Sequence, residues 1–256
     1  MRVVNIIPTY NEKDNIGPML NCLLKLAQKN KKYDFYHLVV DDESPDKTAI
    51  IVKEFQKKNK NIYLLSGLRV GLGDALCRGY EYAIKNLKAD VVIPNDCDFS
   101  FDPKHIPEML ARIEKGRDVV VASRHTGSGS SEGWTWFRRL NHFVANELFA
   151  WYLAGITEVH DHNGNFRAIR VKGVLDQINW SRLKIKGFGF LMYMTYKMAK
   201  YTDKFFEIPV TFTFRIRGES KVSFNRKYIH TYFRDVFEYI KLCILIRLER
   251  LRLYSF

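Results

Sequence analysis

The sequence predicts an α/β protein built on a doubly wound, mostly parallel sheet, with an amphipathic helical extension at its C-terminal end. Short segments that are apolar throughout alternate with segments whose apolar residues repeat at helical spacing, which is typical of a parallel sheet covered by helices on both faces. The chain has 256 residues, of which 46% are hydrophobic, so it can bury the core of one large domain. No proline-, glycine- or polar-rich linker divides it, which favours one domain with an extension over two domains.

The first half of the chain contains most of the predicted strands and the helices between them. A helix after the first strand is indicated by apolar residues at helical spacing between residues 16 and 27, with Asp14 as its candidate N-cap. Two further helical stripes lie in residues 50–55 and 75–87. The strands themselves are expected at residues 3–8, 36–40, 62–66, 91–94 and 119–123.

The second half of the chain departs from this alternation. Residues 126–133 are expected to form a glycine- and serine-rich loop, and an aromatic, basic run then leads into a helical stretch that extends to Gly155. Residues 208–214 are expected to form a strand. The chain is accordingly divided into a main domain, residues 1–226, and a basic, amphipathic helical tail, residues 227–256.

The positive charge of the chain is concentrated in its last part. The formal net charge is +13, from 41 Lys/Arg and 28 Asp/Glu. Residues 1–180 are nearly balanced, with 25 Lys/Arg and 22 Asp/Glu, so residues 181–256 carry +10 of the total. A basic helix that also carries aromatic side chains is typical of a membrane surface, and we expect residues 228–256 to lie on an anionic bilayer.

The chain is not expected to cross the membrane. A span needs about 20 uninterrupted apolar residues, whereas the most apolar stretches, residues 143–156 and 236–248, are shorter and contain Asn, Glu, Lys or Arg. The first residues lack the pattern of a signal peptide. The four cysteines show neither disulfide nor zinc spacing, which fits a reducing compartment. We therefore expect a cytoplasmic protein that is peripheral at the membrane.

Polar residues follow four of the predicted strands at the point where each strand ends. They are residues 8–12 (PTYNE), 41–46 (DDESPD), 95–100 (NDCDFS) and 123–124 (SR). Because the carboxyl ends of parallel strands meet at one edge of a sheet, these residues predict a single site. Its acidic pair at i and i+2 in NDCDFS can present two oxygens to a hard cation such as Mg²⁺ or Mn²⁺. An isolated pair of this kind more often caps a helix; the clustering favours the metal site.

Seven motifs follow one another along residues 3 to about 225. They are PTYNE, VVDDESPDKT, LRVGLGDA, NDCDFSFDPKHIPEM, ASRHTGSG with WTWFRR, DHNGNFRAIR and FRIRGESK. In this order and spacing they resemble the family 2 glycosyltransferases, and most closely the dolichyl-phosphate (polyprenyl-phosphate) mannosyltransferases of that family. DHNGNFR and RGESK are the motifs that indicate the polyprenyl-phosphate branch. The resemblance implies a metal-dependent enzyme whose glycosyltransferase catalytic domain is residues 1–226.

The resemblance also implies roles for individual residues. Asp98, Arg124 and Arg138 would be catalytic, and Asp96, Asp98 and Ser100 would ligate the metal. The acceptor phosphate would bind to Arg138 and Arg215; guanidinium groups suit this role because they grip phosphate oxygens in a two-pronged geometry. The donor would be bound by Pro8, Tyr10, Glu12, Val40, Asp41, Asp42, Asp96, Cys97, Asp98, Arg124, Arg215 and Lys221.

The reaction implied by the resemblance is the transfer of a sugar, with mannose from GDP-mannose favoured, onto a polyprenyl phosphate, with Mg²⁺ or Mn²⁺ as cofactor. A phosphate acceptor is largely a dianion at neutral pH and needs no base, which predicts one inverting displacement. The alternative is a family 2 enzyme that uses another nucleotide sugar and a saccharide acceptor in surface-polysaccharide synthesis. Whether a membrane-anchoring partner subunit takes part is left open by the sequence.

Other interpretations were weighed beside this one. A nucleic-acid binder is suggested only by the net charge of +13, and acidic strand ends would repel a phosphate backbone, so no nucleic acid is expected. The run His160-Asp161-His162 has too few ligands for zinc and is more often a loop. Trp134 and Trp136 suit either a core or a lipid-facing rim.

Overall fold

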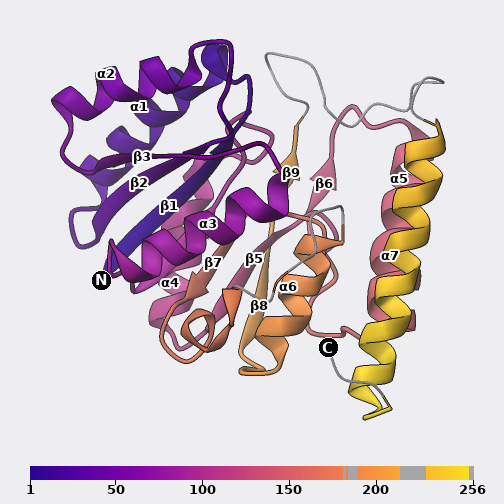
Figure 1. Cartoon of the computed structure of the whole chain (residues 1–256). Coiled ribbons are helices and arrows are strands. Elements are labelled where there is room, and N and C mark those ends of the chain that lie inside the picture. Colours follow the sequence, from indigo (N-terminus) through magenta and orange to yellow (C-terminus); the bar gives the residue numbers. More distant parts are fainter. Residues whose placement is uncertain (181–182, 184–188, 214–228, 254–256) are drawn as a thin grey trace.

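A sheet of seven strands forms the centre of the molecule (Figure 1). The computed structural model describes residues 1–180, 183, 189–213 and 229–253. Neighbouring strands are parallel except at β7, which runs antiparallel to β4 and to β5. The α/β class and the mostly parallel sheet are thus confirmed. In sheet order the strands are β3 (Ile62–Ser66), β2 (Asp34–Asp41), β1 (Arg2–Thr9), β4 (Val91–Pro94), β7 (Arg167–Arg170), β5 (Val119–Ser123) and β8 (Phe205–Pro209).

The chain order reverses at the centre of this sheet. From β1 the chain proceeds through β2 to β3 at one edge and then returns to place β4 on the other side of β1. At such a switch point the loops after the two central strands diverge and leave a crevice for ligands. The ends of β1 and β4 therefore mark the place where this fold binds a ligand.

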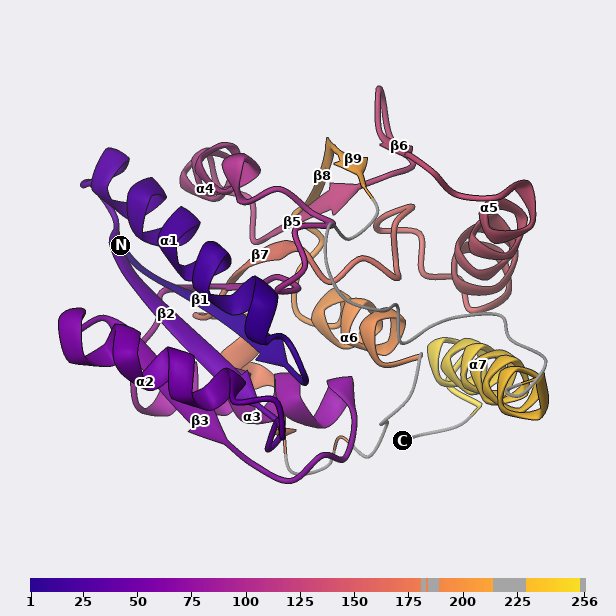
Figure 2. The ribbon, with the colours of Figure 1, turned by 90° about the horizontal axis from the view of Figure 1, so that it is seen from above.

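Helices cover both faces of the sheet (Figure 2). Side chains of β1 show how the sequence divides the core, because successive residues of a strand point to opposite faces. Val3 and Ile7 pack in the cluster that contains α1, α2 and α4, whereas Val4 and Ile6 pack in the cluster that contains α3 and α6. These helices are α1 (Lys13–Lys29), α2 (Thr48–Lys58), α3 (Leu72–Lys85), α4 (Ile106–Glu114) and α6 (Phe190–Ala199).

A glycine sets the distance between α3 and the sheet. A Cβ at Gly79 would lie 2.8 Å from the side chain of Ile6 and 3.2 Å from that of Val40. Any larger residue would push the helix away from β1 and β2. The helix thus lies directly against the strands whose ends form the switch point.

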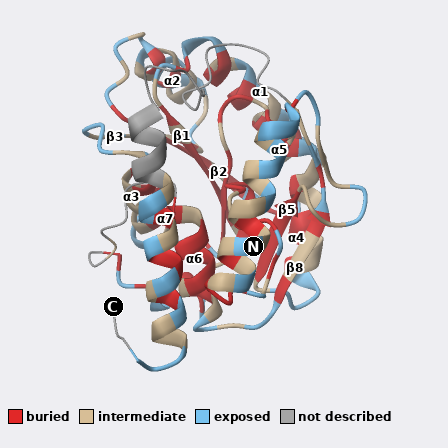
Figure 3. Cartoon of the chain, turned by 90° about the vertical axis from the view of Figure 1, so that its right-hand side faces the viewer, coloured by how far each residue is buried: buried red, intermediate tan, exposed pale blue. Residues whose placement is uncertain are grey.

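Two further helical segments lie side by side beyond α6 (Figures 1 and 3). The first is α5 (Trp136–Phe143), which continues into the π-helix η2 (Val144–Leu153), and the second is α7 (Ile229–Arg250). One side of α7 packs against η2 and α6 through Tyr239, Leu242, Cys243 and Ile246. Its other side exposes Phe237, Lys241 and Ile244, which are spaced at i, i+4 and i+7 and so share one face. Among the described residues, no helix has the length and apolar character needed to span a membrane.

The second half of the chain also differs from the sequence-based expectations. The strand expected at residues 208–214 was wrong as a single element: β8 ends at Pro209, and β9 (Thr211–Phe212) pairs instead with β6 (Ser130–Ser131). The chain leaves the main sheet after Pro209, where the Val210 carbonyl accepts from the Ser130 amide. The expected loop at 126–133 therefore contains a short strand. No strand was expected at β7, whose four residues include two arginines.

Candidate active site

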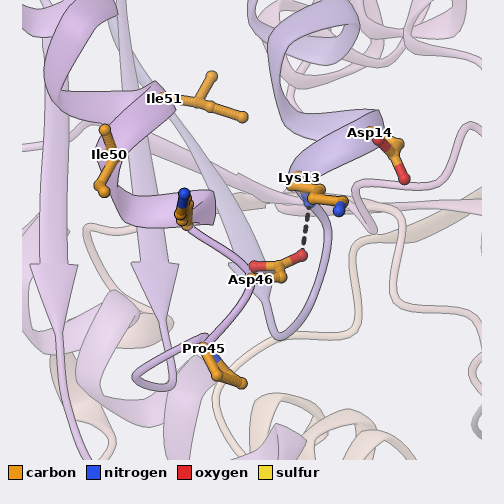
Figure 4. A pocket seen from close by; sticks show the side chains of 7 residues that line it. Lys13, Asp14, Pro45, Asp46, Ile50 and Ile51 are labelled. Atoms are coloured by element: carbon orange, nitrogen blue, oxygen red, sulfur yellow. Dashed lines mark hydrogen bonds between the residues drawn. The ribbon is translucent and has the colours of Figure 1, made fainter.

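The loops that follow β1 and β2 are tied to each other by hydrogen bonds. The backbone N–H of Asn11 donates to the Ser44 hydroxyl over 3.0 Å, and that of Lys13 donates to the Asp46 carboxylate over 3.0 Å. The latter bond crosses a shallow depression where α1 and α2 begin (Figure 4). The N–H of Glu12 donates to the Thr48 hydroxyl over 3.0 Å. These bonds fix both loops before any ligand binds.

The two acids at the end of β2 have different partners. Asp41 accepts from the hydroxyls of Thr9 and Ser44, over 2.9 and 2.6 Å. Asp42 forms an ion pair with Arg78 of α3, which also binds Asp74 over 3.0 Å. Burial raises the pKa of Asp42, and the attraction of Arg78 offsets only part of this effect. Both carboxylates are therefore held in place at the carboxyl edge of β2.

The acidic loop, residues 95–100, follows β4 directly. Asp96 accepts a hydrogen bond from the Asn165 amide over 3.1 Å, and Asp98 accepts from the backbone N–H of Ser100 over 3.0 Å. Between Asp98 and Ser100, Phe99 has a φ of 61°, in the left-handed region that bulky side chains avoid. Strain of this kind persists where the surrounding structure fixes the backbone, which favours a functional role for the loop.

Backbone strain recurs in the other two loops at this edge. Asn11 after β1 and Glu43 after β2 have φ values of 55° and 51°. The three loops at the switch point thus each contain a non-glycine residue in the left-handed region. Such residues cluster at ligand-binding sites because the backbone must turn sharply there while side chains converge.

The acidic loop offers a donor set that fits a divalent cation. Asp98 is 7% exposed, and Asp96, Asp98 and Ser100 present only oxygen ligands. Hard cations such as Mg²⁺ and Mn²⁺ take oxygen ligands from one or two carboxylates together with substrate phosphates. The chemistry of the loop therefore agrees with the metal site expected from the sequence.

A second part of the site lies at the end of β5, where Arg124 meets Asp161. The guanidinium donates from Nε and Nη2 to the two oxygens of the carboxylate, over 2.7 Å each, and the Arg124 backbone N–H donates over 3.0 Å. The two side chains are 6% and 0% exposed. Burial alone would raise the pKa of Asp161, but the charge and hydrogen bonds of Arg124 hold it well below its usual range. Among the described residues, none accepts a hydrogen bond from Nη1 of Arg124, so this nitrogen can donate to a bound anion.

Trp134 joins Arg124 to Arg138. Its ring centre lies 5.4 Å from the Arg124 guanidinium carbon and 4.5 Å from that of Arg138, within the range of cation–π interaction. Burial lowers the pKa of Arg138, and the charge of Arg124 lowers it further. Trp134 is 7% exposed and Trp136 is 75% exposed, so the first belongs to the core and the second to the surface.

The acidic loop and the arginines meet through aromatic rings. Phe101, just after the acidic loop, lies 5.4 Å from the Arg124 guanidinium carbon and 5.2 Å from the ring of Phe212. Phe212 in turn contacts Trp134 at 5.3 Å. The structure thus brings the fourth and fifth strand ends into one region, as the sequence predicted.

Two histidines flank the ion pair. Ligand atoms of His125, His142 and Asp161 lie within 4.8 Å of one another, a spacing that could hold a metal ion. Both oxygens of Asp161, however, already accept from Arg124, and the guanidinium charge would repel a cation. The acidic loop therefore remains the better candidate for the metal.

The remaining predicted residues that the structure describes lie in or directly after β1, β2 and β4. Pro8 is at the end of β1, and the ring of Tyr10 is covered by Arg69 at 3.8 Å. Glu12 accepts from the Asn15 amide over 2.6 Å. Val40 points into the core below α3, and Cys97 is 2% exposed within the core. Arg215 and Lys221 lie outside the described residues.

Sequence reasoning missed three residues of this site. Asp161 and Asn165 belong to the motif DHNGNFRAIR, but no role in the site was predicted for either. A buried arginine requires a counter-charge, which Asp161 supplies to Arg124. Arg78 and Asn165 lie 36 and 69 residues from their partners Asp42 and Asp96, so no local pattern pairs them.

The fold and its acidic loops are those of an α/β protein with a candidate ligand site at the carboxyl edge of a mostly parallel sheet. Comparison with protein families identifies it further. Residues 5–175 match the model of Glycosyl transferase family 2, and the chain belongs to this family.

Alignments with named relatives cover most of the chain. It is 32% identical over 241 residues to the dolichol-phosphate mannosyltransferase of Pyrococcus furiosus, a match that covers 94% of this chain but 64% of that protein. The polyprenol monophosphomannose synthase of Mycolicibacterium smegmatis is 29% identical, with 87% of this chain and 81% of that protein covered. The undecaprenyl-phosphate mannosyltransferase of Micrococcus luteus is 30% identical, with 87% and 88% covered.

Solved structures share the fold at lower identity. Mannosyl-3-phosphoglycerate synthase from Rubrobacter xylanophilus matches all of this chain and 76% of its own, with a TM-score of 0.66 and 17% identity. A mannosyltransferase from Pyrobaculum calidifontis, solved with GDP-Man and Mn²⁺, matches 86% of this chain and 58% of its own, with a TM-score of 0.54 and 18% identity.

Proposed function

We propose that this chain transfers mannose from GDP-mannose to a polyprenyl phosphate, with inversion at the anomeric carbon. The observation that carries the proposal is the meeting of the acidic loop with Arg124, Arg138 and Trp134 on one family 2 domain. An acidic loop suits a metal-bound diphosphate, and a pair of arginines suits a second anion. The names of the relatives, at about 30% identity, support the transfer of mannose and a polyprenyl phosphate acceptor.

The chemistry requires little more than positioning from the chain. A divalent cation held by Asp96, Asp98 and Ser100 would neutralise the leaving diphosphate. The acceptor phosphate has a second pKa of about 6 and is already a nucleophilic dianion at neutral pH, so no general base is needed. Arg124, through Nη1, and Arg138 would hold the two substrates' negative charges close together. One displacement then gives a β-linked product from an α-linked donor.

A position on the cytoplasmic membrane face also follows from this proposal. The helix that carries Arg138 exposes Trp136, Phe137, Leu140 and Phe143, at 75%, 40%, 47% and 50%. Figure 3 shows exposed and half-exposed residues along the outer sides of α5 and α7. An apolar helix surface beside a phosphate-binding arginine suits an acceptor whose lipid remains in the bilayer. A membrane-anchoring partner subunit would be a second means of holding the chain there.

A screen of donors and acceptors tests the proposal. The purified chain is incubated with Mg²⁺ or Mn²⁺, with GDP-mannose, UDP-glucose or UDP-GlcNAc, and with polyprenyl phosphate or a saccharide acceptor. We expect transfer only from GDP-mannose to polyprenyl phosphate, lost in EDTA and restored by added metal. The one-bond coupling constant between C1 and H1 of the transferred mannose should indicate the β configuration. Transfer to the saccharide alone would support the polysaccharide alternative, and an α product would exclude inversion.

A further inference from the structure

Residues 160–165 (HDHNGN), here called the bridging segment, contact both sides of the candidate active site. Near the start of the segment, Asp161 holds the guanidinium of Arg124 through two hydrogen bonds of 2.7 Å. At its end, Nδ2 of Asn165 donates to the carboxylate of Asp96 over 3.1 Å. One short segment thus joins the acidic loop to the end of β5. A shift of its backbone would move both contacts.

Two charged side chains of the sheet hold the backbone of the bridging segment. Glu207 of β8 accepts from the first two backbone N–H groups of the segment, over 3.0 and 3.1 Å. Arg167 of β7 is buried and donates to the carbonyls of His162 and Gly164, over 2.6 and 2.8 Å. The side chain of Asn163, in the middle of the segment, is held instead by the helices beyond α6.

Asn146 of η2 is the first of these helical contacts. It is fully buried, and its Oδ1 accepts from the backbone N–H of His162 over 2.8 Å and from Nδ2 of Asn163 over 3.2 Å. Its Nδ2 donates to the carbonyl of His142, one turn earlier, over 2.8 Å. The oxygen therefore uses both of its lone pairs on the bridging segment. Asn146 lies in a π-helix, a rare geometry that occurs mostly at functional sites.

Tyr239 of α7 supplies the second helical contact. Its hydroxyl accepts from Nδ2 of Asn163 over 3.3 Å and donates to the carbonyl of Ala145 over 3.2 Å. Burial raises the pKa of Tyr239, so the hydroxyl keeps its proton at neutral pH. The two hydrogens of Asn163 Nδ2 thus go to Asn146 and Tyr239. A buried network in which every member is satisfied specifies one geometry, and the loss of one member affects the others.

We propose that Tyr239 is a positioning residue for the transfer reaction, because from α7 it holds the bridging segment in the conformation that joins the acidic loop to Arg124. This inference rests on the proposed function for the reaction that it affects. The effect passes from the hydroxyl through Asn163 to Asp161 and Asn165, which lie to either side of it. A displacement of about 1 Å at a reacting group can lower a rate about a hundredfold. The helix α7 then acts in the reaction independently of any lipid surface.

Transfer to a water-soluble acceptor separates this role from membrane binding. The full chain is assayed with GDP-mannose, Mn²⁺ and a short-chain isoprenyl phosphate in the absence of lipid. Tyr239→Phe removes the hydroxyl but keeps the ring, and we expect kcat/KM to fall by about tenfold. Tyr196→Phe on α6 is the matched control. Tyr196 is buried in the same apolar cluster, but its hydroxyl interacts with Glu249, so this variant should keep wild-type activity.

Hydrogen exchange on the same variants measures the position of the bridging segment without any substrate. The backbone N–H groups of Arg124 and His162 donate to Asp161 and Asn146, so each reports on one contact of the segment. We expect both groups to exchange about tenfold faster in Tyr239→Phe and at the wild-type rate in Tyr196→Phe. A lower urea midpoint with normal transfer and normal exchange of these two groups would overturn the proposal, because Tyr239 would then be merely structural.

Asn163→Ala removes the same link from the other side and keeps the proposal testable if Tyr239→Phe does not fold. Transfer should fall to a similar extent. The double variant should be no slower than Asn163→Ala alone, because both substitutions break one connection. Additive losses, or normal transfer beside faster exchange, would contradict the proposal. If the wild type transfers no mannose but exchange changes as expected, the proposed function is wrong and the link from α7 to the bridging segment stands.

Discussion

The two sides of the candidate active site are built in different ways. The proposed donor side consists of consecutive residues in the loops after β1, β2 and β4, tied together by backbone hydrogen bonds such as that from Lys13 to Asp46. The proposed acceptor side is assembled from residues far apart in the sequence, among them Arg124, Arg138 and Asp161, and much of it is carried by α5. No residue of α5 is buried.

This difference indicates which part of the site must be rigid and which part must be accessible. In the proposed function a metal and a diphosphate are held in fixed geometry, for which the strained, cross-linked loops of the sheet are suited. In the same proposal a lipid acceptor enters from the bilayer, and the exposed helix α5 would give it access. The buried ion pair of Arg124 and Asp161 anchors the proposed acceptor side, which is otherwise exposed. The following predictions test that contrast, from the largest expected effect to the smallest.

Removal of Asp161 should have the largest effect. Asp161→Ala leaves the guanidinium of Arg124 buried without its counter-charge, which typically costs about 3–5 kcal/mol of unfolding free energy. Urea unfolding followed by circular dichroism measures this loss. Glu54→Ala removes one partner of the exposed pair of Glu54 and Lys57 and serves as the control, with little expected change. Equal stability of the two variants would mean that the acceptor side has another anchor.

On the proposed donor side, the acidic loop should control activity and not stability. Asp98→Ala should lower kcat by at least a hundredfold, about 3 kcal/mol, because the charge of the leaving diphosphate is no longer neutralised. Mannosyl transfer with saturating GDP-mannose and Mn²⁺ is the measurement. Asp102→Ala removes an acid that caps the short 3₁₀ helix η1 (Pro103–His105) and should retain most activity. Full activity of Asp98→Ala in EDTA would remove the acidic loop from the reaction.

The contrast also explains what the sequence could predict. The strands at 62–66, 91–94 and 119–123 were predicted with their observed bounds, because an unbroken apolar run is a local property. The acidic loop was found for the same reason. The partner of Arg124 and the division of the strand at 208–214 depend on contacts with residues distant in sequence, and no local pattern contains them.

Acid should destabilise both sides through buried histidines. Burial lowers the pKa of His37 in β2 to about 4 and that of His162 to about 3. Because both stay neutral when folded, their stability contribution is present above the unfolded pKa of about 6.5 and is lost as pH falls toward the folded values. Between pH 6.5 and 5 each can cost up to about 2 kcal/mol.

Urea unfolding across this pH range measures how steeply the free energy of unfolding changes with pH. His37→Gln and His162→Gln should each reduce this slope by the contribution of one histidine, while the denaturant m-value stays constant. An unchanged slope in either variant would mean that the replaced histidine takes up its proton as readily in the folded state as in the unfolded state.

The smallest effect is expected at the outer face of α7. Lys241 lies between Phe237 and Ile244 on the side of the helix that faces away from the domain. A basic side chain near an anionic bilayer contributes about 1 kcal/mol, so Lys241→Ala should weaken binding to phosphatidylserine vesicles by about fivefold at low salt. The difference should shrink as salt is added, because screening shortens the reach of the charge. Lys53→Ala on α2, at the opposite end of the molecule in Figure 1, is the control and should bind vesicles as the wild type does. Equal losses in the two variants would show that vesicle binding reflects overall charge and not the exposed face beside the acceptor side.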